Sequence, residues 1–420
     1  MNNVRFIILA GLGLFLSVAP SVWAVPQFAR MYSFNCSTCH YPGYGQLNKF
    51  GYEFRAAGYR LPKDIGKDMN EGAFDASKYM SIRFSAGVKG TTTTQPSNVP
   101  IPDSASFTLG GASLFMGGGI SKNFFAYSEL GFGNGTGIFP GTVPSFSDIK
   151  MGYVTGTETD FWTIRAGKFN ADGFAGSDRG PVGNASIASV VRPVGTGAEL
   201  GYTHDDTRIT LGFYNGIQNA QKTGLVSTSN GAPVTSNSIQ APTSDNNNAK
   251  DFQIFVNQFI GDDGLAVNAT YYNGFNESIG ANGNTTTTAD ADWAGQEYYN
   301  AALFVSSPVV KNLDVKAGGE LGQTNAGVFS TTGKVGPTTG GVFAELDYEM
   351  DEITPLGLRW DYTATDLNKQ YTDTQKFTFG ALTPVVENIY LNPQYTLTMT
   401  DAAAGYTYAH AVQGSLNVFF

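Results

Sequence analysis

The sequence predicts an all-β fold, a transmembrane antiparallel β-barrel of about 16 strands, preceded by a small α-helical head. Composition is the first reason: 13% of the 420 residues are aromatic, 14% are charged and 52 are glycine, which is unusual for a soluble α/β enzyme. The second is alternation, since segments of about ten residues place apolar and polar side chains in turn, as transmembrane strands do. The third is that long polar connections and short turns follow one another in strict order.

Residues 1–24 have the layout of a secretory signal peptide. Arg5 supplies the positive start, residues 6–18 are apolar, and Val22-Trp23-Ala24 is a small-residue cleavage site. The apolar run is shorter than the ~20 residues that a membrane-spanning helix needs, which argues against an anchor. No later stretch is long and apolar enough to span as a helix. A chain of this kind in a membrane must therefore form a closed barrel, because open sheet edges are not satisfied in lipid.

The only two cysteines lie together in the motif Cys36-Ser37-Thr38-Cys39-His40. In the haem c attachment motif each thiol adds across a haem vinyl group, and the histidine becomes the proximal ligand of the iron. A small disulfide is the plainer alternative for an exported protein. A zinc site would need two further thiol or imidazole ligands, and none lie nearby. We therefore predict one covalent haem c held by Cys36, Cys39 and His40.

Residues 25–77 are expected to form the head, a small monohaem cytochrome c domain. Leu47, Phe50 and Phe54 recur at helical spacing with polar residues between them, so they predict a short amphipathic helix. About fifty residues make only a marginal core. The haem is the large apolar object that this helix would pack against, and the barrel wall would help to complete the core.

The sixth ligand of the iron is left open by the sequence. Met69 is a candidate thioether ligand and Met31 a weaker one, with a vacant or water-bound position as the alternative. The other two histidines, His204 and His410, fall in strand rows expected to face lipid, so both are poor candidates for iron ligation.

Residues 78–420 are expected to form the barrel. In the segment Met80–Lys89 every second residue is apolar, so one row should face lipid and the other the lumen. The last segment, residues 406–420, alternates in the same way and ends on an aromatic residue. An even strand number places both ends of the barrel on the periplasmic side. By analogy with porins, the loop at residues 170–195, which contains Asp172, Asp178 and Arg179, is expected to fold into the lumen as a constriction.

The same register points charged side chains into the lumen. The plainer interpretation is that these charges hydrate and cross-link a polar interior, and the sharper one is a cation path, since carboxylates suit hard divalent ions. The excess of 35 acidic over 25 basic residues is consistent with the latter, and without a basic patch nucleic-acid binding is not expected. Large inward side chains would narrow an open channel. The inward charges are Arg83, Arg165, Lys316, Arg359, Glu129, Glu199, Glu320, Glu345, Asp347 and Asp361, and the large side chains are Phe125, Tyr127, Phe161, Phe169 and Phe343.

One known pattern matches the head. Residues 24–30, the motif at residues 36–40, the stretch Phe50-Gly51-Tyr52-Glu53-Phe54 and Gly58-Tyr59 together resemble the fused monohaem cytochrome-porins of the outer membrane of iron-oxidising bacteria. The match covers about forty residues, and over the barrel the agreement is in architecture alone.

The resemblance implies an iron:cytochrome c oxidoreductase type of electron transfer. In such a protein Fe(II) outside the cell is the electron donor, one haem c carries the electron, and a periplasmic c-type cytochrome is the acceptor. Cys36 and Cys39 would be the thioether attachments and His40 the proximal ligand. Two other functions stay open on the sequence. One is a conduit that runs outward or serves another donor, and the other is a diffusion porin in which the head is a plug or sensor.

Overall fold

The structure is a computed structural model of the full chain, and it describes these residues: 27–34, 38–40, 47–68, 76–94, 103–132, 145–173, 181–182, 194–215, 228–229, 232–233, 251–261, 265–277, 295–310, 312–325, 335–350, 354–364, 366–367, 369–370, 373–386, 389–401, 403 and 405–419.

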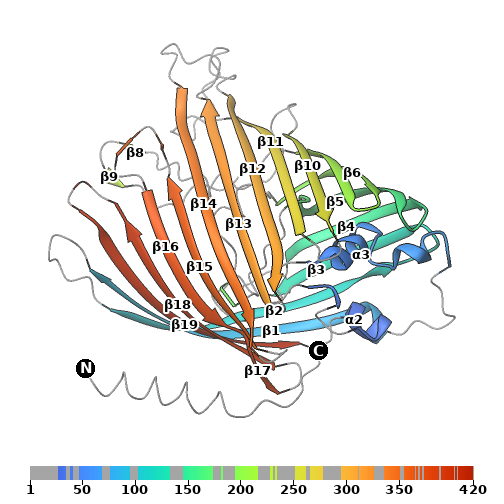
Figure 1. Ribbon diagram of the computed structural model, residues 1–420, viewed down its shortest axis with the longest axis horizontal. Helices are drawn as coiled ribbons and strands as arrows, with labels where there is room; N and C mark the ends of the chain where they lie inside the picture. Colours follow the sequence, from blue (N-terminus) through green and yellow to red (C-terminus); the bar gives the residue numbers. More distant parts are fainter. Residues whose placement is uncertain are drawn as a thin grey trace.

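A closed antiparallel barrel makes up most of the described chain (Figure 1). Strands that follow one another in sequence lie side by side, and the last strand pairs with the first, as in Arg83 opposite Phe419. The strands are β1 (Met80–Thr94), β2 (Ser104–Gly119), β3 (Phe124–Phe132), β4 (Ser145–Gly156), β5 (Asp160–Asn170), β6 (Val194–His204), β7 (Thr207–Tyr214), β10 (Asp251–Ile260), β11 (Leu265–Glu277), β12 (Gly295–Val310), β13 (Leu313–Asn325), β14 (Val335–Glu349), β15 (Pro355–Ala364), β16 (Asp373–Ala381), β17 (Thr383–Val386), β18 (Ile389–Thr400) and β19 (Thr407–Phe419).

Two of these elements are parts of one strand. Both β16 and β17 pair with β18, and only Leu382 lies between them, so the barrel has 16 strands, as predicted. A separate two-stranded pair, β8 (Thr228–Ser229) with β9 (Ala232–Pro233), is not part of the barrel sheet.

The two faces of the strands follow the predicted alternation. On β1 the outward row is exposed, with Ile82 at 40% and Val88 at 55% of full exposure, whereas Phe125 on β3 and Phe161 on β5 point inward at 1%. Apolar side chains outside and a mixed interior are what a strand in a transmembrane barrel needs. The predicted outward row of β1 and the predicted inward side chains of β3 and β5 are therefore confirmed.

The two histidines in strands face outward, as predicted. The side chain of His204 is 61% exposed at the short-turn end of β6, where its ring stacks on Tyr202, which in turn lies beside Trp162. His410 lies near the opposite end of the barrel, where its Nδ1 atom is 2.8 Å from the hydroxyl of Tyr395. Aromatic and imidazole rings at the rims are typical of the girdles of membrane barrels.

The head consists of short helices: α2 (Gln27–Tyr32), α3 (Lys49–Ala56), the 3₁₀ helix η2 (Pro62–Asp64) and α4 (Ala76–Tyr79). Helix α3 confirms the predicted amphipathic helix but begins later than expected. Asn48 caps it by accepting a hydrogen bond from the Gly51 amide at 2.9 Å, so Leu47 precedes the helix. Among the described residues no helix is long and apolar enough to cross a membrane.

The head joins the barrel through α4, which runs directly into β1 at Met80 and spans the boundary expected at residues 77 and 78. Figure 1 shows α2 and α3 beside β1 to β5, on the side where the short turns lie. The Arg30 guanidinium donates to the Met80 carbonyl at 2.5 Å, and the Ser81 hydroxyl donates to Gln27 at 3.1 Å. These contacts hold α2 against the first strand.

The loop after β5 contacts two walls of the barrel. Asp172 is buried beside β5 and β7, whereas the Pro181 carbonyl accepts hydrogen bonds from Asn392 at 3.3 Å and Gln394 at 3.0 Å on β18. Strand β18 lies six strands from β5 by the shorter way round. The described parts of the loop therefore contact two walls of the lumen. Residues 174–180 and 183–193, which include Asp178 and Arg179, lie outside the described residues, so the constriction expected from residues 170–195 stays a prediction.

Candidate functional site: the head within the barrel lumen

The predicted attachment segment is fixed to the start of α3. Of its residues, Thr38, Cys39 and His40 are described, while Cys36 and the candidate ligand Met69 lie outside the described residues. His40 forms an antiparallel bridge with Leu47, and the Asn48 amide donates to the Cys39 carbonyl at 3.0 Å. The Asn48 side chain also donates to the Thr38 carbonyl at 3.1 Å. One asparagine thus caps the helix and holds the segment.

Gly51 lets the attachment segment approach the helix closely. A Cβ atom at this position would lie 2.1 Å from the Cys39 carbonyl oxygen, which is far inside van der Waals contact. Only glycine can therefore stand in the first turn of α3 under this segment. The sequence pattern had marked the position in the resemblance, and the structure supplies the reason for it.

The chemistry of the described residues suits a haem c. Cys39 and His40 are adjacent and half-buried, so a thiol and an imidazole are offered together from a backbone fixed at both sides. A thioether needs one such thiol, and the iron needs one imidazole nitrogen.

The aromatic residues of α3 pack mainly on protein. Phe28 of α2 stacks on Tyr59 at a centroid distance of 5.0 Å and meets the edge of Phe54 at 5.4 Å. Tyr32 also meets Phe54, at 5.6 Å. The expected contribution of the barrel wall to this core is therefore confirmed, and the rings of α2, which the sequence analysis did not include, pack on the same face.

The large inward side chains of the barrel form the seat of the head. Tyr59 stacks on Tyr127 of β3 at 4.9 Å and meets the edge of Phe125 at 6.1 Å. On the other side of α3, Tyr52 meets Phe259 of β10 at 5.7 Å. Of the five side chains expected to narrow an open channel, Phe125, Tyr127 and Phe161 thus pack with the head, whereas Phe169 and Phe343 pack on other rings of the barrel.

Polar contacts at the short-turn end hold the rest of the head. The buried Arg60 guanidinium donates to three carbonyls of the β2–β3 turn, those of Ser121 at 3.0 Å, Lys122 at 2.6 Å and Phe124 at 2.8 Å. Lys49 pairs with Asp206 in the β6–β7 turn. The head is therefore bound to the end of the barrel at which β1 begins and β19 ends.

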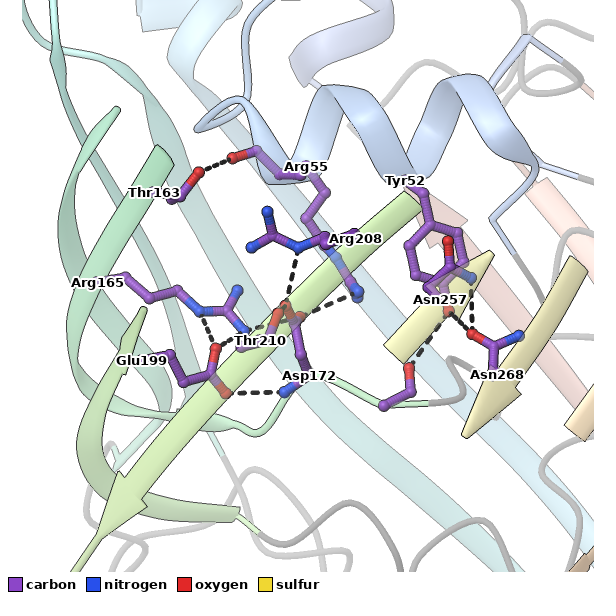
Figure 2. A network of polar contacts seen from close by, with 12 residues as sticks. Tyr52, Arg55, Thr163, Arg165, Asp172, Glu199, Arg208, Thr210, Asn257 and Asn268 are labelled. Atoms are coloured by element: carbon purple, nitrogen blue, oxygen red, sulfur yellow. Dashed lines mark hydrogen bonds and ion pairs between the residues drawn. The ribbon is translucent and has the colours of Figure 1, made fainter. Parts of the chain in front are cut away.

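A buried ionic network joins α3 to the wall and to the loop after β5 (residues 170–195), the third long loop of the barrel (Figure 2). Asp172, 2% exposed, lies 3.2 Å from Arg55 of α3, 2.7 Å from Arg165 of β5 and 3.3 Å from Arg208 of β7, and it accepts the Thr210 hydroxyl at 3.0 Å. Burial alone would raise the pKa of Asp172, but the three guanidinium groups hold that pKa well below its usual range.

Glu199 of β6 is the second carboxylate of the network. It accepts the Asp172 amide at 2.8 Å and the Arg165 Nε at 2.5 Å, and the Tyr214 hydroxyl also donates to it. The sequence singled out Arg165, Glu199 and Asp172, but it did not bring them together. Arg208 was missed, although it alternates with outward Ile209 and could have been placed inside by the same rule.

The end of α3 receives hydrogen bonds from the wall. The Thr163 hydroxyl donates to the Ala56 carbonyl at 2.7 Å, so one of the orphan carbonyls at the helix end is satisfied. The Tyr52 hydroxyl is 3.3 Å from the Gly173 carbonyl and 3.5 Å from Asn268 (Figure 2).

The other predicted inward charges lie in the lumen, and among the described residues all of them except Glu320 form ion pairs. Lys316 pairs with Glu345 and Asp347, and Arg359 pairs with Asp361 at 2.8 Å and with Glu345 at 3.4 Å. Arg83 lies 3.6 Å from Glu129. Glu320 is also buried.

The carboxylates of the described lumen are interleaved with basic groups. Within the described ranges no three histidine, cysteine or acidic side chains gather as metal ligands would. The pair of Lys150 and Asp148 on β4, at 2.9 Å, is a further inward pair that the sequence analysis missed. The observed pairing agrees with the plainer interpretation of the inward charges, a cross-linked polar interior.

Comparison with solved structures identifies the fold. The outer membrane channel DcaP of Acinetobacter baumannii is 10% identical and has a TM-score of 0.56, over 81% of this chain and 96% of that one. An anion-selective porin from Comamonas acidovorans is 9% identical with a TM-score of 0.52, over 81% and 99%. No protein-family model and no curated protein matches the sequence. The fold is thus that of the outer-membrane porins.

Proposed function

We propose that the protein is a porin-like barrel of the outer membrane that carries one haem c on a head seated in its lumen and transfers electrons across that membrane. The observation that carries the proposal is the position of Cys39 and His40. They lie on a head that is bound inside the barrel at its short-turn end. That end is periplasmic in barrels of this kind.

The residues of the head have distinct parts in this function. Cys36 and Cys39 would hold the haem covalently and His40 would bind its iron, with Met69 or a water molecule as the candidate for the remaining iron ligand. A haem c bound there supplies a one-electron redox couple. Asn48 fixes the attachment segment, and the ring contacts of Phe28, Tyr32 and Phe54 hold α2 against α3.

Donor and acceptor follow from the resemblance of the head to the fused cytochrome-porins. Extracellular Fe(II) is the electron donor, and a periplasmic c-type cytochrome is the acceptor. The outward apolar rows and aromatic rims support a site in outer-membrane lipid, reached by way of the signal peptide at residues 1–24. A conduit that runs outward, or one that serves another donor, would use the same parts.

The test is to add Fe(II) at controlled pH to the purified, haem-loaded protein and to follow the haem absorbance. We expect reduction of the haem by Fe(II) and its reoxidation by an added c-type cytochrome. His40→Ala should abolish both changes while the barrel still folds, and the matched His204→Ala, at an outward position, should leave them intact. A haem that Fe(II) fails to reduce, with a potential well below that of the iron couple, would rule out iron as the donor.

A diffusion porin with the head as a plug is the second candidate, and the fold favours it. The two solved structures compared above are an outer membrane channel and an anion-selective porin, and in this chain Pro181 of the loop after β5 contacts the inner side of β18. Liposome swelling with small solutes distinguishes the two functions. Solute uptake by the wild-type protein at rates typical of open porins would favour diffusion, and negligible uptake together with haem reduction would favour electron transfer.

A further inference from the structure

We propose that Asp172 is a latch that fastens the head to the third long loop and so keeps the lumen closed to ions. The head, the loop after β5 and the wall of β5 to β7 all meet at this one carboxylate (Figure 2). The proposal goes beyond electron transfer, because it concerns conduction through the barrel and holds whether or not the head carries a haem.

The loop is held firmly where it leaves β5. The Asp172 amide donates to Glu199 at 2.8 Å, and its carbonyl accepts the Gln253 side chain at 2.7 Å, so both sides of the residue are tied to the wall. Together with Thr210 and Arg208, these bonds fix where the carboxylate points. The carboxylate of Asp172 is therefore held in place by the wall when it pairs with Arg55.

The same loop is also held at the far wall. Pro181 rests on two glycines of that wall: a Cβ at Gly380 would lie 1.9 Å from its carbonyl oxygen, and a Cβ at Gly357 would lie 2.8 Å from its ring. Asn392 and Gln394 donate to the same carbonyl. The described parts of the loop, residues 170–173 and 181–182, therefore contact opposite walls of the lumen, and the head lies against the first part through Arg55 and Tyr52.

The three arginines depend on Asp172 to different degrees. Arg165 keeps Glu199 as a second partner, and Arg208 also donates to the Thr203 hydroxyl at 3.0 Å, so both arginines remain paired on strands if Asp172 is lost. Among the described residues the only carboxylate that pairs with Arg55 is Asp172. Without the negative charge, the partly buried guanidinium group of Arg55 faces the buried ones of Arg165 and Arg208. The repulsion then displaces Arg55, which belongs to the head, because the other two keep partners on the strands.

The experiment measures the conductance of the full-length, haem-loaded protein in planar lipid bilayers. We expect wild type to show little conductance, and Asp172→Asn and Arg55→Met each to raise the mean conductance at least tenfold. The double variant should exceed neither single one by more than about twofold, because both remove the same contact. Lys67→Ala, which breaks the exposed pair with Asp64 elsewhere on the head, should behave as wild type.

Folding of each variant is checked by heat-dependent migration on gels, and Arg55→Lys provides a conservative variant that keeps the charge and should stay closed. Wild-type conductance from folded Asp172→Asn and Arg55→Met would overturn the latch. So would a wild-type protein that already conducts as an open porin, or an equal rise in Lys67→Ala. Failure of Fe(II) to reduce the haem would leave these results unchanged, so the latch and the proposed electron transfer fail separately.

Discussion

Single residues determine how the attachment segment is held. Asn48 uses its side-chain oxygen to cap α3 and its side-chain nitrogen to hold Thr38, while Gly51 leaves room for the Cys39 carbonyl. Each of these contacts is local, so a single substitution can remove one of them and leave the others in place.

Asn48→Ala should weaken α3 by about 1 kcal/mol, the usual worth of an N-cap, and should also free the attachment segment. Asn48→Asp keeps the cap but loses the donor to Thr38, so it should retain helix stability and lose only the fixed segment. The measurement is the ratio of covalently bound haem to protein, with the thermal midpoint of the haem absorbance. Full loading and an unchanged midpoint in Asn48→Ala would contradict the assignment.

Gly51→Ala should displace the attachment segment, because the added Cβ would meet the Cys39 carbonyl at 2.1 Å. We expect lower haem incorporation than in wild type. Gly90→Ala is the matched control, since a Cβ there finds no atom closer than 3.9 Å. Equal incorporation in the two variants would show that the segment lies elsewhere.

Glu53 gives a pH-dependent prediction. Burial, with the nearby negative charges of Asp206 and Glu158, raises the pKa of Glu53 in spite of Lys49. A raised folded pKa means that the folded head binds the proton more tightly, so ionisation destabilises it as the pH rises past about 4.3, the usual glutamate value. Glu53→Gln should therefore raise the thermal midpoint of the head at pH 7 and leave it unchanged at pH 4. A lower midpoint at pH 7 would contradict this.

At the scale of elements, α3 is held in the lumen by contacts at both ends and on two sides. Its start binds the attachment segment, its apolar side packs on α2, and its end receives the Thr163 hydroxyl. An eight-residue helix has little stability of its own. The barrel wall is therefore what keeps it folded.

Thr163→Val should remove the hydrogen bond to Ala56 and leave that carbonyl buried without it, at a cost of about 1 to 3 kcal/mol. Thr155→Val, on the outward face of β4, is the control and should have little effect. Limited proteolysis of the head reports the difference. Equal protection in both variants would show that this contact does not hold the helix.

The latch at Asp172 should survive moderate acid. Burial acts against ionisation, but Arg165, Arg55 and Arg208 hold the pKa of Asp172 well below its usual range. A lowered folded pKa gives stability that is complete above about 3.9, the unfolded value, and is lost as the pH falls through the folded value. Bilayer conductance should thus stay low down to pH 4 and rise in stronger acid, whereas Asp172→Asn should conduct at every pH. An increase between pH 6 and 5 would point to another group.

At the scale of the whole molecule, the barrel positions the head between two compartments. The outward rows face lipid, the short turns and the head lie at one end, and the long connections lie at the other. The fold alone does not decide the function, because the same barrel serves diffusion and other purposes.

Orientation in the membrane can be tested on intact cells. An epitope inserted into the long connection at residues 216–249 should be accessible to antibody, and the same epitope in the β6–β7 turn at Asp205 should be accessible only after the outer membrane is opened. Accessibility of the Asp205 epitope on intact cells would place the head outside and reverse the proposed topology.

The sequence by itself determined the barrel. The strand count, the outward row of β1, the outward histidines and the inward charges from Arg83 to Asp361 all follow from a period of two, which is a local property of the chain. It also supplied the haem motif, which remains a prediction about Cys36, Cys39 and His40.

Only the tertiary structure decided where the head lies and what it touches. Arg55 meets Asp172 across 117 positions, and Tyr52 meets Asn268 across 216. A local sequence pattern does not predict such contacts, because the partners belong to α3, β5, β7 and the third long loop, which are far apart in the sequence and adjacent only in the folded barrel. The period of two correctly places Phe125 and Tyr127 inside the barrel, but only the folded structure shows that they pack against the head.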